Sequence, residues 1–316
     1  FADGKLTYWA SSQGTHDFRD GAAKCLGMDP ADVRVLVKDV GGGFGAKGMV
    51  SEEEVIVGQL ARLIGRPVRW VEGRTENLSA YVHGRAQAQT VTIGGNRDGR
   101  VTHYRLDVVQ DCGAYPKWGA FLPEFTRQLA SGVYDIANLE FSAVSVATNT
   151  APTCAYRGAG RPEATAAIER AMDLFAAEVG MDVAELRRVN LLASEAFPYT
   201  TPTGTSMDSG DYEGSLDRAL AAVDYAGLRA EQKRRREAGD PVQMGIGVAT
   251  YVEITGFGGS EYGEVRLRSD GTVLASTGAT PIGTGHHTTW AMIVADRLGV
   301  PLDSIEVFHG DTESIP

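Results

Sequence analysis

One short pattern occurs twice, near the two ends of the chain: the end of a helix, a Leu-Gly pair, a turn containing proline, and a strand rich in β-branched residues. It reads CLGMDPADVRV at residues 25–35 and RLGVPLDSIEV at residues 297–307, and the copies align without a gap. A polar loop precedes each helix, SSQGTH in the first copy and IGTGHH in the second. Two copies of a short pattern can arise by chance, but repetition is typical of repeated supersecondary units. We therefore predict an α+β fold of two related lobes, residues 1–200 and 201–316, whose strand-to-helix loops face a shared site.

Periodicity and capping signals define the elements between these copies. The clearest helix begins after Ser51, with Glu54 placed for a capping box. It carries an apolar stripe at residues 56, 60, 63 and 64, and it ends before Gly65 and Pro67. Comparable signals predict further helices at 16–27, 161–180, 182–192, 213–223 and 226–238. Alternating apolar residues predict strands at 5–10, 32–40 and 242–254, and hairpins at 88–109 and 263–277.

Composition excludes several classes of protein. The chain has 316 residues, 43% of them hydrophobic, which is ample for a globular core. Its net charge of −11 argues against nucleic acid as a partner, because nucleic-acid binding depends on clustered Lys and Arg. Cys25, Cys112 and Cys154 are isolated, which fits a reducing, cytoplasmic setting and indicates no disulfide framework or metal site. No stretch approaches the roughly 20 apolar residues that span a bilayer.

The segment DVGGGFGAKGMV at residues 39–50 concentrates glycines directly after a predicted strand. It lacks the G-x-G-x-x-G fingerprint of dinucleotide-binding folds, and Gly48 stands where a phosphate-binding P-loop has Ser or Thr. A flexible linker is unsuitable between two capped elements. The remaining interpretation is a tight turn that binds an anion or a cofactor, with Phe44 placed against something flat.

Five segments in a fixed order carry a family resemblance: DVGGGFGAKG at 39–48, RPVRWVEGRTENL at 66–78, TNTAPTCAYRGAGRPEA at 148–164, FPYTTPTGTSMDSGDY at 197–212 and the segment 283–312. Together they resemble the large, molybdenum-binding subunit of the xanthine oxidase family of molybdenum hydroxylases. The nearest kin look like large subunits of aerobic carbon monoxide dehydrogenase and its relatives with an AYRGAGR loop. The resemblance covers essentially the whole chain and implies that the chain is part of a longer subunit.

The resemblance implies an oxidoreductase whose molybdenum is held by the dithiolene of molybdopterin cytosine dinucleotide, without a direct protein ligand. Such enzymes hydroxylate a carbon centre with oxygen derived from water. They pass electrons through [2Fe-2S] centres to FAD. The implied partners are an FAD-binding medium subunit and a [2Fe-2S] small subunit, in a dimer of heterotrimers. The chain agrees, because it has no cysteine cluster for iron–sulfur ligation.

Residue by residue, the resemblance assigns catalytic roles to Gln13, Phe44 and Arg157, with Gln13 facing the oxo ligand of the metal. A neutral amide donor suits that position, although Gln13 could also be a solvated loop residue. His286 could instead cap its helix. The implied cofactor-binding residues fall on three loops: Gly43, Phe44 and Gly45; Ala155, Tyr156 and Arg157; and Gly283, Thr284, Gly285 and His286.

Departures from the family pattern bear on the substrate. Gly158 stands where copper-containing carbon monoxide dehydrogenases carry a cysteine, and Gly48 stands where xanthine dehydrogenases carry a purine-binding glutamate. Thr284 replaces the glutamine of the usual GQGH loop. The loop AYRGAGR instead resembles that of a second group of carbon monoxide dehydrogenase-like proteins, and this resemblance implies a small aldehyde or an N-heterocycle as substrate.

The general base of the family is a glutamate in a GxGE-type loop, which we expect beyond residue 316. We therefore expect residues 1–316 alone to be inactive; otherwise Glu163 is the first candidate for the base. The alternatives are a carbon monoxide dehydrogenase large subunit, a non-catalytic cofactor-binding fragment, and an anion-binding α/β module unrelated to molybdenum.

Overall fold

The computed structural model describes residues 1–254, 256 and 259–315. Contacts divide the chain into two compact units that do not follow chain order. Unit 1 joins Phe1–Tyr81 with Gly256–Pro316, and unit 2 is Val82–Thr255. The compact units are defined by contacts, whereas the predicted lobes 1–200 and 201–316 are defined by a sequence repeat. The boundary between the two lobes therefore stays a prediction.

The amino-terminal part of unit 1 is a β-α-β arrangement. Strand β1 (Leu6–Ala10) pairs in parallel with β2 (Val33–Val37), and helix α1 (Thr15–Leu26) and the 3-10 turn η1 (Pro30–Asp32) connect them. Alternate residues of both strands point into a core with Phe18 of α1, as the apolar alternation predicts. Helices α2 (Glu52–Ile64) and α3 (Arg74–Ala80) follow, and the predicted capping box of Ser51 and Glu54 is confirmed.

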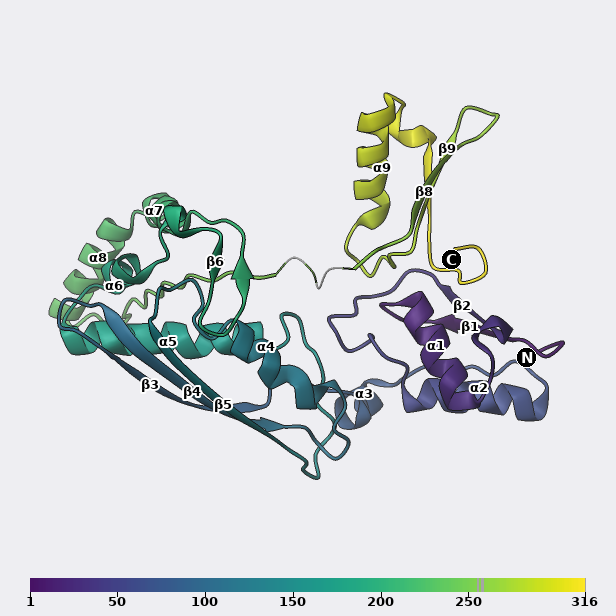
Figure 1. The fold of residues 1–316 in the computed structure, drawn as a ribbon, viewed down its shortest axis with the longest axis horizontal. Coiled ribbons are helices and arrows are strands. Elements are labelled where there is room, and N and C mark those ends of the chain that lie inside the picture. The colour runs from purple at the N-terminus through teal and green to yellow at the C-terminus, as the bar shows by residue number, and fades with distance from the viewer. Residues whose placement is uncertain (255, 257–258, 316) are drawn as a thin grey trace. The chain divides into compact units, whose positions relative to one another are not determined.

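The carboxy-terminal part of unit 1 repeats this arrangement (Figure 1). Strand β9 (Val273–Thr277) pairs in parallel with β10 (Ile305–Phe308) and antiparallel with β8 (Gly263–Leu267). Helix α9 (His286–Leu298) and the turn η4 (Leu302–Ser304) connect β9 to β10. Gly27 and Gly299 end α1 and α9 in the same left-handed conformation, with φ of 61° and 66°. The repeated sequence pattern therefore corresponds to a repeated structure.

Hydrogen bonds join the two β-α-β arrangements inside unit 1. The hydroxyls of Thr15 and Thr280 lie 2.8 Å apart and are buried. Arg34 of β2 donates two hydrogen bonds to Asp311, which lies shortly after β10. The backbone N–H of Val37 donates to the carbonyl of the residue before Asp311. The loops that follow β1 and β9 therefore meet, as do the segments at the carboxyl ends of β2 and β10.

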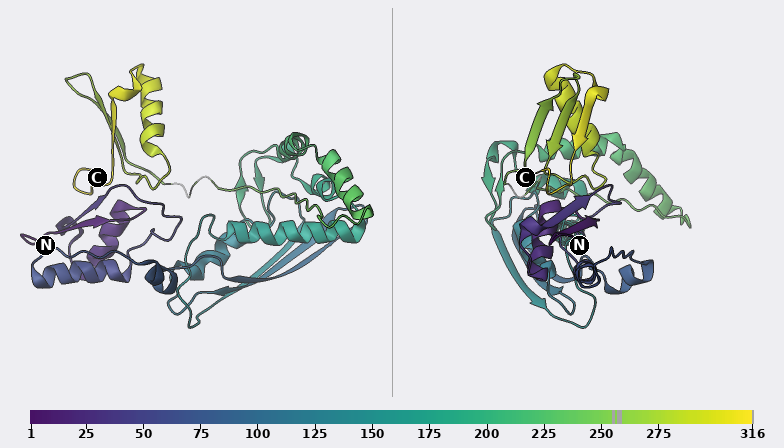
Figure 2. Two further views of the ribbon diagram at one scale, coloured as in Figure 1. Left: turned by 180° about the vertical axis from the view of Figure 1, so that it is seen from behind. Right: turned by 90° about the vertical axis from the view of Figure 1, so that its right-hand side faces the viewer.

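Unit 2 is a three-stranded sheet with helices on one face, as the two opposed views of Figures 1 and 2 show. Strand β4 (Val101–Asp111) is central, antiparallel to β3 (Gln87–Gly95) and parallel to β5 (Asn138–Val146). Helix α5 (Arg161–Val179) packs its apolar side on Tyr104 and Leu106 of β4. The other elements are η2 (Trp118–Phe121), α4 (Leu122–Gln128), α6 (Val183–Asn190), η3 (Ser194–Ala196), β6 (Tyr199–Thr200), β7 (Ser206–Met207), α7 (Tyr212–Ala222) and α8 (Tyr225–Glu237).

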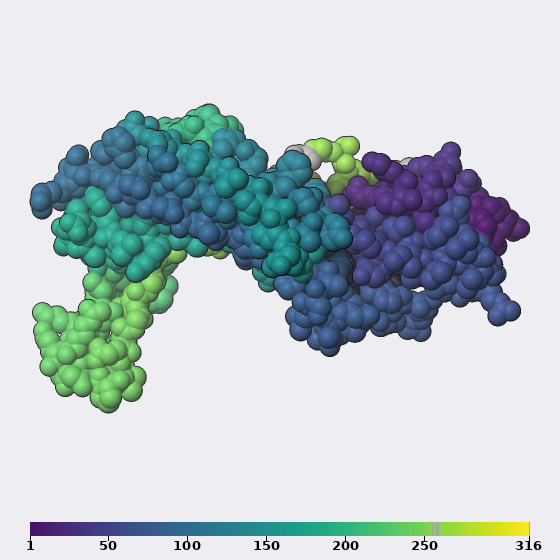
Figure 3. Space-filling model, turned by 90° about the horizontal axis from the view of Figure 1, so that it is seen from below, coloured from purple at the N-terminus to yellow at the C-terminus, as the bar shows by residue number. Residues whose placement is uncertain are grey.

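Helix α8 projects from the body of unit 2, as the light green surface in Figure 3 shows. Gln232 is its one buried residue, and its basic end is exposed, as expected for the run KRRREAGD. None of the helices in the described part of the chain has the length and apolar character needed to cross a membrane.

The prediction of a strand at residues 242–254 is wrong. Within the described residues this segment is extended but pairs with no strand. Its alternation is real, because Val248 and Val252 pack on the core of unit 2 while Tyr251 is exposed. The N–H of Thr250 is bound by the carboxylate of Glu169 instead of a neighbouring strand. The alternation of apolar residues therefore indicated one buried face of the segment. A β-strand also needs backbone hydrogen bonds to a neighbouring strand.

Candidate functional site

The glycine-rich loop after β2 adopts a tight, partly left-handed conformation. Gly42, Phe44 and Gly45 have φ of 93°, 54° and 101°. Left-handed backbone costs a non-glycine residue about 1–2 kcal/mol, so Phe44 is held against a local preference. A Cβ atom on Gly42 would lie 2.5 Å from the ring of Phe44. The side chain of Phe44 is about half exposed to solvent. The loop therefore presents an aromatic ring from a strained position, as a ligand-contacting loop does.

Gln13, in the loop between β1 and α1, holds this glycine loop in place. Its Oε1 accepts hydrogen bonds from the backbone N–H of Gly45 at 2.7 Å and of Lys47 at 3.2 Å. A Cβ atom on Gly43 would lie 2.3 Å from the Gln13 side chain. Because both bonds require an acceptor, they orient the amide, and its NH₂ group is the end that can donate to a ligand. The N–H of Gly45 is committed to Gln13 and so shapes the loop.

The loop before α9 offers a second polar surface in unit 1. Gly283 and Gly285 have left-handed φ of 92° and 77°, and a Cβ atom on either would meet no described atom within 4 Å. His286 begins α9, and its Nδ1 is buried without a hydrogen-bond partner among the described residues. The alternative that His286 caps its helix finds no support, because the N-cap residue is Gly285 and no side chain makes a cap hydrogen bond there. A buried polar atom without a partner marks a place where a ligand can bind.

His309, which follows β10, lies beside His287, the residue next to His286. Its ring lies 4.8 Å from the ring of His287, and its Nδ1 is also buried without a described partner. Burial, followed by the charges of His287 and Lys38, lowers the pKa of His309 below its usual value. The neutral imidazole is therefore favoured, and it can exchange a hydrogen bond with a polar ligand.

The third predicted loop lies in unit 2. Tyr156 and Arg157 are exposed, and Ala155 is half-buried. A backbone hydrogen bond joins the start of this segment to the chain before β3, because the N–H of Cys154 donates to the carbonyl of His83 at 2.7 Å. Gly158 has φ of 93°, and a Cβ atom there would lie 2.4 Å from the ring of Pro162. This backbone leaves no space for a cysteine at Gly158.

The structure thus brings Gln13 directly against residues 43–45 and places residues 283–286 in the same unit. Residues 155–157 belong to unit 2. Sequence reasoning did not identify Arg85, which binds the loop at 155–157. Its contacts reach residues 71 and 72 positions away, and no local spacing signals such a contact.

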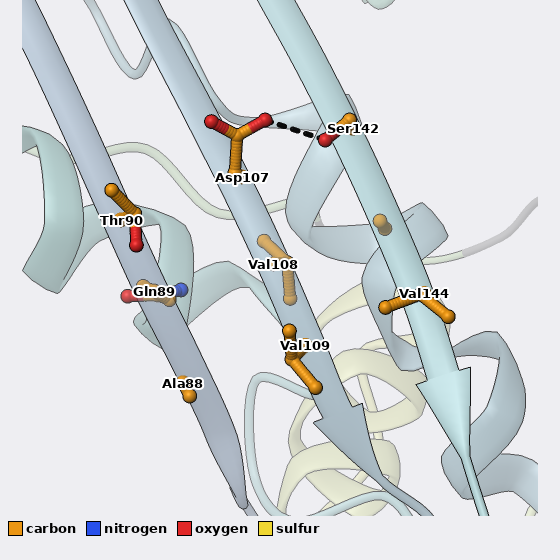
Figure 4. A pocket seen from close by; sticks show the side chains of 9 residues that line it. Ala88, Gln89, Thr90, Asp107, Val108, Val109, Ser142 and Val144 are labelled. Atoms are coloured by element: carbon orange, nitrogen blue, oxygen red, sulfur yellow. Dashed lines mark hydrogen bonds between the residues drawn. The ribbon is translucent and has the colours of Figure 1, made fainter.

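A shallow groove of about 300 Å³ lies on the outer face of the unit 2 sheet, between β3, β4 and β5 (Figure 4). Ala88, Val109 and Val144 line it at one end. Asp107 at the other end accepts from the Ser142 hydroxyl at 2.5 Å and from Arg105. Its charged group, Asp107, is already paired and none of the predicted site residues lines the groove, so it is a poor candidate for the active site. In the described ranges, no group of three or more His, Cys, Asp or Glu side chains is placed to hold a metal ion.

Comparison with known families decides the relationship of the chain. Two sequence models described as molybdopterin cofactor-binding domain match residues 1–191 and 218–316. The chain belongs to the molybdopterin cofactor-binding domain family. This confirms the resemblance that the five motifs indicated.

Similar molybdopterin-binding proteins include the carbon monoxide dehydrogenase large chain of Hydrogenophaga pseudoflava, 37% identical over 99% of this chain and 41% of the relative. The nicotine 6-hydroxylase large subunit of Paenarthrobacter nicotinovorans is 33% identical over 98% of this chain and 40% of the relative. The crystal structure of quinoline 2-oxidoreductase from Pseudomonas putida 86 covers 98% of this chain and 41% of its own, with a TM-score of 0.92 and 31% identity. The chain therefore spans about two fifths of these relatives, and the predicted α+β cofactor-binding fold is confirmed.

Proposed function

We propose that this chain is the cofactor-binding part of a molybdenum hydroxylase large subunit that oxidises a small N-heterocycle or aldehyde. The observation that carries the proposal is the pair formed by Gln13 and the glycine loop, because it orients an amide donor beside a strained aromatic ring. The buried, unpartnered Nδ1 of His286 in the same unit fits a polar cofactor. When bound, the molybdopterin cofactor supplies a two-electron oxidation that uses oxygen from water.

The chain's own residues then bind and orient. Gln13 would donate a hydrogen bond to the bound cofactor from its NH₂ group, and the half-exposed ring of Phe44 would contact it. The cytosine dinucleotide form of the cofactor fits the open space beside Gly283, Thr284 and Gly285 and the imidazole of His286, because glycine loops at a helix N-terminus admit phosphate groups. In unit 2, Ala155 and Tyr156 form the backbone of the third predicted loop, and the exposed Arg157 would supply a positive charge for the substrate.

Gly158 supports an organic substrate over carbon monoxide. A cysteine thiolate at this position is the copper ligand that the resemblance requires for carbon monoxide oxidation, and the backbone of Gly158 does not accept a Cβ atom. Quinoline 2-oxidoreductase and nicotine 6-hydroxylase, named for N-heterocyclic substrates, are among the similar proteins. The second candidate is a carbon monoxide dehydrogenase large subunit, which the 37% identity to such a chain favours.

We further propose that the full-length subunit acts in the cytoplasm with an FAD-binding medium subunit and a [2Fe-2S] small subunit, as a dimer of heterotrimers. The three isolated cysteines support this, since they cannot hold an iron–sulfur cluster within this chain.

The experiment is to purify the native complex through the full-length subunit, measure molybdenum, copper, flavin and iron–sulfur content, and assay aldehydes, N-heterocycles and carbon monoxide. We expect molybdenum with flavin and iron–sulfur absorption, and turnover of an aldehyde or N-heterocycle. Copper at the site with rapid carbon monoxide oxidation would establish the second candidate. A complex without molybdenum would exclude both.

A further inference from the structure

We propose that Arg85 is a positioning residue that holds the loop 155–157 in the geometry needed for turnover. The proposal rests on the proposed function, because it takes this loop as the part of unit 2 that faces the substrate. Arg85 lies just before β3 and makes its contacts with the loop inside unit 2.

The Arg85 guanidinium binds the loop backbone directly. Nη2 donates to the carbonyl of Arg157 at 2.9 Å, and Nη1 reaches the carbonyl of Tyr156 at 3.4 Å. The same group lies over the ring of Tyr156, 4.9 Å from its centroid. Arg85 therefore contacts the backbone of two successive loop residues and one of their side chains, and leaves the side chain of Arg157 exposed.

Glu163 connects the same guanidinium to the end of the loop. Its Oε2 accepts from Nη1 of Arg85 at 3.0 Å and from the N–H of Gly160 at 2.9 Å. Glu163 is 8% exposed, so these two donors replace the hydrogen bonds that water would otherwise make to the carboxylate. Arg85 and Glu163 together bind the backbone of the loop at both ends, at Tyr156 and Arg157 and at Gly160. A planar guanidinium can bind several acceptors in fixed directions, which an ammonium group cannot do.

The loop has internal backbone hydrogen bonds from Ala159 to Tyr156 and from Arg161 to Gly158, but its strained backbone also needs support from outside the loop. Gly158, Ala159 and Gly160 have successive left-handed φ values of 93°, 43° and 88°. Arg85 itself has φ of 69°, and a strained residue of this kind persists where its surroundings hold it in place. Gly84 lets the backbone pack closely, since a Cβ atom there would lie 2.3 Å from the Cβ of Tyr156.

The test compares Arg85→Gln and Arg85→Lys with Arg127→Gln in the full-length holoenzyme. Arg127 is a matched control: its side chain is 36% exposed against 38% for Arg85, and it also binds a carboxylate, of Glu124, and a backbone carbonyl. Three quantities are measured: kcat per bound molybdenum, KM, and the hydrogen exchange of the peptide 155–163.

We expect Arg85→Gln to lower kcat per bound molybdenum by about 10- to 100-fold, because small misplacements at an active site have effects of this order. Exchange of the N–H groups of Ala159 and Gly160 is expected to rise by about tenfold or more, with Arg85→Lys intermediate in both measurements. Arg127→Gln is expected to leave both unchanged. If Arg85→Gln does not fold, Arg85→Lys carries the comparison.

Wild-type kcat and exchange in both Arg85 variants would overturn the inference. A loss of activity that only follows a loss of bound molybdenum would also overturn it, since this indicates a structural role. If the wild-type complex contains no molybdenum, the proposed function fails, and the exchange measurement alone then decides whether Arg85 holds the loop.

Discussion

At the scale of single residues, Gly43 is required for a different reason from its neighbours. Gly42 and Gly45 have left-handed backbone, whereas Gly43 does not. Gly43 is buried, and the space where its side chain would lie is filled by Gln13. Glycine at position 43 therefore leaves space for the side chain of Gln13, which binds the loop through hydrogen bonds.

We predict that Gly43→Ala displaces Gln13 and destabilises the loop by about 1–3 kcal/mol, a usual range for overpacking. The full-length subunit carrying it is expected to bind less molybdenum. Adding Gln13→Ala relieves the clash, so the double variant is expected to be less than additive. The matched control is Gly41→Ala, because a Cβ atom on the exposed Gly41 meets no described atom within 4 Å. Equal effects of the two glycine substitutions on thermal unfolding would contradict this account.

At the scale of elements, helix α2 buries its small residues and exposes its large ones. Gly58 and Ala61 face the core of unit 1, and a Cβ atom on Gly58 would lie 1.8 Å from the Tyr8 hydroxyl. The apolar residues that defined the helix in the sequence are exposed: Ile56 at 55%, Leu60 at 42%, Leu63 at 70% and Ile64 at 56%. The capping signals located the helix correctly, but the apolar stripe did not indicate the face that packs.

We predict that Gly58→Ala lowers the thermal unfolding midpoint, although alanine favours helix by about 1 kcal/mol over glycine. The Tyr8 hydroxyl donates to the carbonyl of Glu54, so the ring cannot move aside without losing that bond. Overpacking of this kind costs about 1–3 kcal/mol. Leu63→Ala, on the exposed face of the same helix, is the control and is expected to change the midpoint little. A stabilised Gly58→Ala variant would show that the helix can shift away from Tyr8.

The ion pair between Arg34 and Asp311 gives a prediction about pH. Hydrogen bonds from Arg34 hold the pKa of Asp311 below its ordinary value of 3.8. A carboxyl with a depressed folded-state pKa stabilises the fold above the ordinary value, and the contribution is lost as the pH falls through the folded-state pKa. Asp311→Asn is therefore expected to lower the unfolding midpoint at pH 7 and to lose this difference below about pH 4.

The control for the pH effect is Asp270→Asn. Asp270 also has a lowered pKa, but through hydrogen bonds from Thr272 inside one hairpin turn, so it does not connect the two β-α-β arrangements. An Asp311→Asn variant as stable as the wild type at pH 7 would contradict a stabilising role for the ion pair.

At the scale of the whole molecule, the predicted site residues are divided between the two compact units. Gln13 and the loops 43–45 and 283–286 belong to unit 1, and the loop 155–157 belongs to unit 2. The family resemblance implies a glutamate as the general base. Glu163 is a poor replacement, because its Oε2 already binds Arg85 and the backbone of Gly160.

We predict that residues 1–316 alone do not turn over any substrate. Loss of a general base commonly lowers the rate by about 10²- to 10⁴-fold. The check is to load this chain and the full-length subunit with cofactor, and to assay both with N-heterocycles, aldehydes and an artificial electron acceptor. Comparable activity of the short chain would place the base within it, and Glu163→Gln would then be the next variant to measure.

The sequence by itself determined the longer helices, several of their caps and the repeated β-α-β pattern, whereas the short helices α3 and α4 were not predicted. The box of Ser51 and Glu54 and the ends of α1 and α9 at Gly27 and Gly299 appear where the sequence predicts them. These features depend on residues within a few positions of one another, so their physics is local. The family resemblance assigned Gln13 to the oxo ligand of the metal, which stays a prediction, and the contact of Gln13 with the glycine loop came from the structure.

Only the tertiary structure decided which elements meet. Residues 242–254 alternate like a strand but have no strand partner among the described residues, and α2 packs its small face. Arg34 and Asp311 are 277 positions apart, and Arg85 and Arg157 are 72 apart. Such contacts are selected by close packing and by the need of buried polar groups for partners, and these requirements are met in three dimensions between residues whose separation along the chain carries no signal.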